Sequence, residues 1–145
     1  MHPIWYFIYA SLIALIGVSY VTIRLFSTFQ TKTKDRATFT SKYFIHIALI
    51  EIIPLILVVT GFIKMDALAH SINVTLPAVI LGVFWILSVI LIISSKQKIV
   101  ASPTFPKENV QLITSFMFMG FALLSSFPII NVVTLFTVAN IKDFV

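Results

Sequence analysis

The chain has 145 residues, of which 59% are hydrophobic and 10% are charged, and its mean hydropathy is +1.08. A domain of this length could not bury so much apolar surface in its own core, so the composition excludes an ordinary water-soluble fold. The net charge of +5 resides mostly in short connections between apolar runs, without a basic and aromatic stripe, which indicates membrane topology rather than nucleic-acid binding. The absence of cysteine excludes disulfides, Cys-ligated metal sites and thiol chemistry.

Four apolar stretches are long enough to cross about 30 Å of hydrocarbon as helices. They are Ile4–Leu25, Tyr43–Ile63, Ile72–Ile93 and Val110–Val138. Pro54 and Pro128 lie inside the second and fourth stretches, where packed membrane helices tolerate proline as a kink. The sequence therefore predicts an all-α membrane protein with four transmembrane helices.

The charges of the connections predict the orientation of these helices. The first connection, from Arg24 to Lys42, carries five basic residues against one acidic residue, and the third carries three against one. The middle connection and the C-terminal tail are each neutral. The positive-inside rule therefore places the first and third connections in the cytoplasm and both termini outside. We expect a multi-pass protein in the plasma membrane of a prokaryote.

The second and fourth stretches are related by an internal repeat. When the chain is shifted by 74 residues against itself, eleven of the 23 positions between Thr40 and Phe62 are identical, among them Pro54 with Pro128. The first and third stretches align only in hydrophobicity. We interpret the chain as two tandem helical hairpins in the same orientation, residues 1–70 and 71–145. Ser125 occupies in the second hairpin the place of Glu51 in the first.

Glu51 is the single acidic residue within the predicted spans. Because a carboxylate is costly to ionise at the middle of a bilayer, we expect Glu51 to be protonated at rest and able to exchange its proton. Alternatively, the protonated carboxyl hydrogen-bonds to a neighbouring helix, with Ser125, Ser126 or Asn131 as candidate partners, and so stabilises the bundle. The sequence leaves both interpretations open.

The second span contains the motif Ala-Leu-x-Glu-x-x-Pro, formed by Ala48, Leu49, Glu51 and Pro54. It resembles the outer helix of the rotor c subunit, or proteolipid, of F-type and V-type ATP synthases, and the fourth span resembles the same helix without its acid. The resemblance implies that Glu51 carries an ion within an oligomer. Sodium-carrying members of that family have a hydroxyl directly after the acid and a Tyr one turn later, where Ile52 and Ile56 stand here, so we expect a proton.

Two functions from different classes follow from these observations. The first is a divergent c-type membrane protein whose Glu51 takes part in proton translocation within an oligomer. The alternative is a non-transporting four-helix accessory or assembly protein, favoured by the few small residues in the first and third spans. No nucleophile–base pair, phosphate-binding loop or metal motif is present, so we expect no enzyme activity, cofactor or metal. The expected partners are the lipid bilayer and either a second copy or another membrane protein.

Overall fold

The computed structural model describes residues 2–29, 36–65 and 74–142. Its long helices are α1 (Ile4–Thr28), α2 (Arg36–Met65), α3 (Thr75–Val100) and α4 (Val110–Lys142), and a short 3-10 helix, η1 (Lys107–Asn109), precedes α4. All four long helices are long and apolar enough to cross a membrane, and the described part of the chain contains no strand. The predicted all-α, four-helix membrane fold is confirmed.

Helices α2 and α3 extend beyond the apolar stretches at one end of the bundle, and α4 extends to Lys142 at the other end. Helix α2 begins at Arg36 rather than Tyr43, and α3 ends at Val100 rather than Ile93. Hydropathy marks only the part of a helix that lies in hydrocarbon, whereas the backbone hydrogen bonds continue through polar residues. The predicted start of the third span, Ile72, lies outside the described residues, as does the predicted boundary between the two hairpins at residues 70 and 71.

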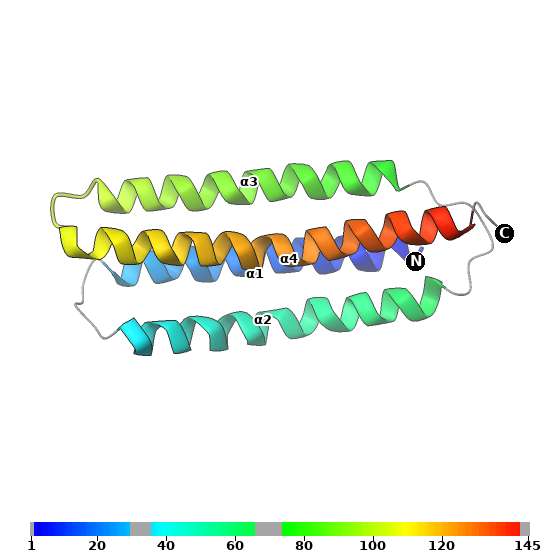
Figure 1. The fold of residues 1–145 in the computed structure, drawn as a ribbon, viewed down its shortest axis with the longest axis horizontal. Helices are drawn as coiled ribbons and strands as arrows, with labels where there is room; N and C mark the ends of the chain where they lie inside the picture. The colour runs from blue at the N-terminus through cyan, green and yellow to red at the C-terminus, as the bar shows by residue number, and fades with distance from the viewer. Residues whose placement is uncertain (1, 30–35, 66–73, 143–145) are drawn as a thin grey trace.

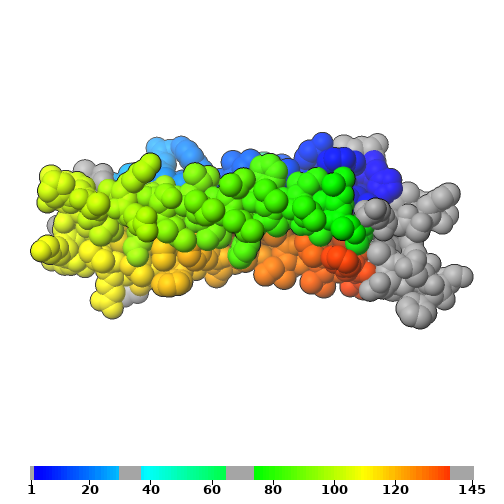
Figure 2. Space-filling model, turned by 90° about the horizontal axis from the view of Figure 1, so that it is seen from above, coloured from blue at the N-terminus to red at the C-terminus, as the bar shows by residue number. Residues whose placement is uncertain are grey.

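Helix α1 lies at the centre of the bundle. It packs against each of the other three long helices, and α3 also packs against α4. Figure 1 shows the four helices side by side in alternating directions, and Figure 2 shows α3 in front with α1 and α4 on either side of it. Small residues on α1, including Ala10, Ser11 and Ala14, are buried, which allows neighbouring backbones to approach closely where lipid supplies no hydrophobic drive.

Two apolar clusters hold the helices together. The larger one lies at the end of the bundle where α1 and α3 end, which we call the basic end because Arg24, Lys42, Lys96 and Lys98 lie there. In this cluster the Phe29 ring lies 5.0 Å from the Phe39 ring and 5.5 Å from the Phe116 ring, measured between centroids. The smaller cluster lies at the opposite end and joins α1, α3 and α4 around Phe7 and Leu135. All four long helices therefore meet in the larger cluster and three in the smaller one, with α1 in both.

Helix α2 has the most exposed apolar surface. Its outward residues include Leu49, Ile53 and Ile56, all more than half exposed, and it packs extensively only along α1. An aliphatic surface of this size is suited to contact with lipid or with another apolar helix. This one-sided packing determines the surroundings of Glu51.

Candidate functional site

Glu51 lies in the middle of α2, half-buried, between the buried residues Ile47 and Pro54. Helix α2 continues through Pro54, as α4 does through the buried Pro128. Beside Glu51, the side chain of Ile50 packs directly onto Gly17 of α1, where a Cβ atom would collide with it. Glu51 therefore lies next to a close approach of α1 and α2, while the neighbouring residues Ile52 and Ile53 of its helix are exposed.

The Glu51 carboxyl has no hydrogen bond or ion pair with any described residue. A carboxylate without donors in an apolar environment is costly, whereas the neutral acid is tolerated. The site therefore favours a carboxyl that carries its proton.

Ser125, which aligns with Glu51 in the internal repeat, forms two hydrogen bonds through its hydroxyl. Its Oγ accepts a hydrogen bond from Trp85 Nε1 of α3 at 3.0 Å and donates one to the carbonyl oxygen of Phe121 at 2.7 Å. The neighbouring Ser126 donates to the carbonyl oxygen of Leu123, also within α4. The serine thus joins α3 to α4, a structural role that Glu51 does not have between α1 and α2 among the described residues.

Asn131 is completely buried between α4 and α1. Its Nδ2 donates to Ser11 Oγ at 2.7 Å and to the carbonyl oxygen of Phe7 at 3.1 Å. These two bonds tie α4 to α1. The three candidate hydrogen-bond partners of Glu51, namely Ser125, Ser126 and Asn131, therefore bond elsewhere, and the structure does not bring them to the carboxyl.

A buried hydroxyl pair between α1 and α2 was not predicted from the sequence. Thr22 Oγ1 and Tyr43 Oη lie 3.0 Å apart, and Tyr43 is only 1% exposed. Gly120 of α4 faces them, and a Cβ atom there would lie 3.0 Å from Thr22. In the sequence, Tyr43 only marked the start of the second span. Its contact with Thr22 and Gly120 joins three helices, and no local sequence pattern predicts such a contact.

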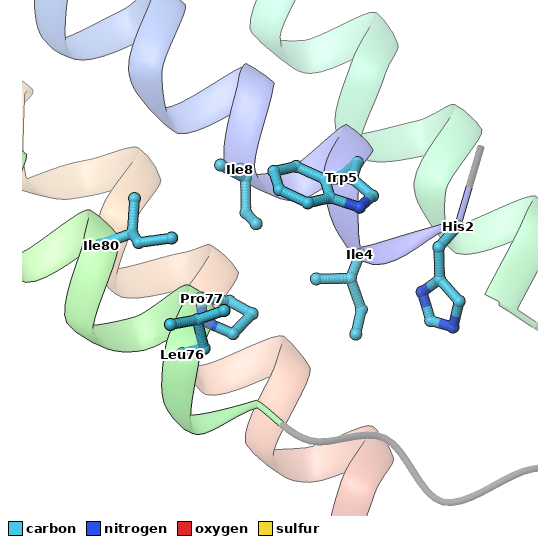
Figure 3. Close-up of a pocket in the computed structure, with 7 residues that line it drawn as sticks. All are labelled: His2, Ile4, Trp5, Ile8, Leu76, Pro77 and Ile80. Carbon is cyan, nitrogen blue, oxygen red and sulfur yellow. The ribbon is translucent and has the colours of Figure 1, made fainter.

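A small pocket of about 230 Å³ lies at the end of the bundle opposite the basic end, between α1 and α3. Figure 3 shows Trp5, Ile4 and Ile8 of α1 facing Leu76, Pro77 and Ile80 of α3, with His2 at the edge. Apart from His2 this lining is apolar and offers no group for chemistry. The described residues also contain no cluster of three His, Cys, Asp or Glu side chains that could hold a metal ion.

No family model, curated protein or solved structure matches the chain. The resemblance of the second span to the rotor c subunit therefore stays a prediction from the motif around Glu51.

Proposed function

We propose that this protein binds and releases a proton at Glu51 within the bilayer and takes part in proton translocation as part of an oligomer in a prokaryotic plasma membrane. The observation that carries the proposal is the contrast between two equivalent positions. Ser125 forms an interhelical hydrogen bond, whereas Glu51 has no described hydrogen-bond partner. An ionisable residue inside a membrane helix is costly, and one without a structural bond is best explained by function.

The residues that follow Glu51 on α2 support a proton rather than a metal cation as the ion. Ile52 and Ile56, which follow Glu51 on α2, are both more than half exposed and apolar, so they supply no oxygen ligands. Sodium requires several oxygen ligands around it, whereas a proton requires only the carboxyl itself. The exposed flank of α2 supports the oligomeric part of the proposal, because it leaves room for a second copy or another membrane helix to approach Glu51.

The alternative function, a non-transporting accessory or assembly protein, is favoured by how the glycines are used. Gly17, Gly61 and Gly120 each face a side chain of another helix inside the bundle, and only Gly82 has no atom within 4 Å of the place of a Cβ. Assembly of a tight ring needs small residues on the outer surface of each unit. Here most of them are used within one chain.

Carbodiimide labelling separates the two functions. The reagent attacks protonated carboxyls in lipid, so we expect Glu51 to be modified in membranes and the modification to fall as the pH rises and the carboxyl ionises. The variant Glu51→Gln is expected to lose labelling of α2. The matched control is Glu108→Gln, which removes an exposed carboxyl in η1 and should leave the labelling of α2 unchanged.

Three results would each contradict a part of the proposed function. A wild-type Glu51 that stays unmodified at every pH would contradict proton exchange and support the accessory role. Protection of Glu51 by sodium ions at constant pH would contradict the choice of a proton. A discrete monomer in mild detergent would contradict an oligomeric translocating assembly.

A further inference from the structure

A groove opens between α1 and α2 at the basic end of the bundle. Its volume is about 410 Å³, and it is lined by both polar and apolar side chains. Arg24 of α1 and Lys42 of α2 contribute its positive charges, and Val21, Leu25 and Phe39 contribute an apolar wall. None of the described residues that line this groove is acidic. The groove therefore combines a cationic part with an apolar part.

The Arg24 side chain is held in place by Tyr20, one turn earlier on α1. Arg24 Nη1 donates a hydrogen bond to Tyr20 Oη at 3.0 Å, and the guanidinium carbon lies 6.0 Å from the centroid of the same ring. This is the one side-chain hydrogen bond of Arg24 among the described residues, so its other N–H groups can donate to a ligand. A planar guanidinium with several donors is well suited to bind phosphate oxygens.

The opposite wall of the groove presents Lys42 and His46, one turn apart on α2. His46 Nδ1 donates to the carbonyl oxygen of Lys42 at 2.6 Å, which orients the imidazole and leaves Nε2 as its second polar atom. Lysine supplies a flexible point charge that complements the fixed guanidinium. Cations from two helices thus line one opening.

The depth of the groove relative to the apolar stretches indicates the class of ligand. Arg24 and Lys42 stand where the apolar stretches of α1 and α2 give way to polar residues, which is the level of the lipid headgroups. Tyr20, at the entrance, is 59% exposed on the outer surface of the bundle. Basic pockets between membrane helices at this depth are suited to acidic headgroups, with the glycerol and acyl carbons on the apolar wall.

We propose that the groove between α1 and α2 binds the phosphate of an anionic phospholipid. Arg24 and Lys42 contact the phosphate, Tyr20 positions the guanidinium, and Val21, Leu25 and Phe39 contact the apolar part of the lipid. A soluble phosphate shares the charged chemistry but would make no use of the apolar wall. The proposal does not depend on any role of Glu51.

Native mass spectrometry of the protein in a neutral detergent tests this site. Phosphatidylglycerol, phosphatidylcholine and inorganic phosphate are added separately, and the bound fraction is measured. We expect phosphatidylglycerol to bind, and the double variant Arg24→Gln/Lys42→Gln to weaken its binding about 25-fold, since each cation at headgroup level contributes about fivefold. The control Lys96→Gln/Lys98→Gln, which removes the same charge from α3 at the same end, is expected to change binding less than about twofold.

A second variant keeps the proposal testable if the double variant does not fold. Tyr20→Phe retains every charge and removes only the hydrogen bond to Arg24, so we expect binding to weaken about threefold. Equal binding of phosphatidylcholine, or an equal loss in the α3 control, would overturn the proposal. If inorganic phosphate displaces the lipid and its binding depends in the same way on Arg24 and Lys42, the groove binds a soluble phosphate. That result would overturn the proposal of a phospholipid site.

Discussion

The variant Asn131→Leu removes the hydrogen bonds that tie α4 to α1. The substitution keeps the branching and approximate volume of the side chain, so little cavity is expected. A hydrogen bond between membrane helices contributes about 0.6 kcal/mol on average and at most about 1.7 kcal/mol. The carbonyl of Phe7 already accepts a bond within α1, so most of the lost stability comes from the bond to Ser11. We expect Asn131→Leu to lower the free energy of unfolding by about 1 kcal/mol in total.

A double-mutant cycle isolates this interaction from the other effects of the substitution. Asn131→Leu, Ser11→Ala and the double variant are unfolded by SDS in a background in which Trp5 is replaced by Phe. The transition is followed by the fluorescence of Trp85, whose Nε1 donates to Ser125 Oγ of α4. We expect a coupling free energy of about 1 kcal/mol between the two positions. Ser126→Ala, which removes a hydroxyl bonded only within α4, is the control. Strictly additive single variants would refute the conclusion that Asn131 and Ser11 join α4 to α1.

The same SDS titration checks two more predictions. Gly17→Leu is expected to lower the free energy of unfolding by about 1–3 kcal/mol, because its side chain would collide with Ile50 and force α1 away from α2. Gly82→Leu is the matched control and should change stability by less than about 0.5 kcal/mol, since no atom lies within 4 Å of its Cβ; equal losses would contradict the close approach of α1 and α2. Glu51→Leu is expected to cost no more than about 0.5 kcal/mol, because the carboxyl has no hydrogen bond with the described residues. A loss of more than about 1.5 kcal/mol in that variant would favour a structural role for Glu51.

The helical extents show how far hydropathy can predict a membrane fold. The apolar stretches located each crossing, but they placed the start of α2 at Tyr43, whereas the helix begins at Arg36. The difference arises because a helix does not end where hydrocarbon ends: its backbone bonds continue into the headgroup region. Similarly, the sequence identified Glu51 as the acidic residue inside a span but left open whether it bonds to another helix. In the structure, Ser125 and Asn131 bond to other helices, and the Glu51 carboxyl has no described partner.

The sequence alone determined the class of this protein, the number of crossings and the position of its intramembrane acid, because each of these depends on local composition over about 20 residues. The tertiary structure alone decided that α1 is central, that Asn131 bonds to Ser11, and that Thr22 meets Tyr43. In a soluble helix an apolar stripe marks the buried face. In a membrane, lipid and neighbouring helices are equally apolar, so hydrophobic residues surround every helix and the pattern does not indicate which face is packed.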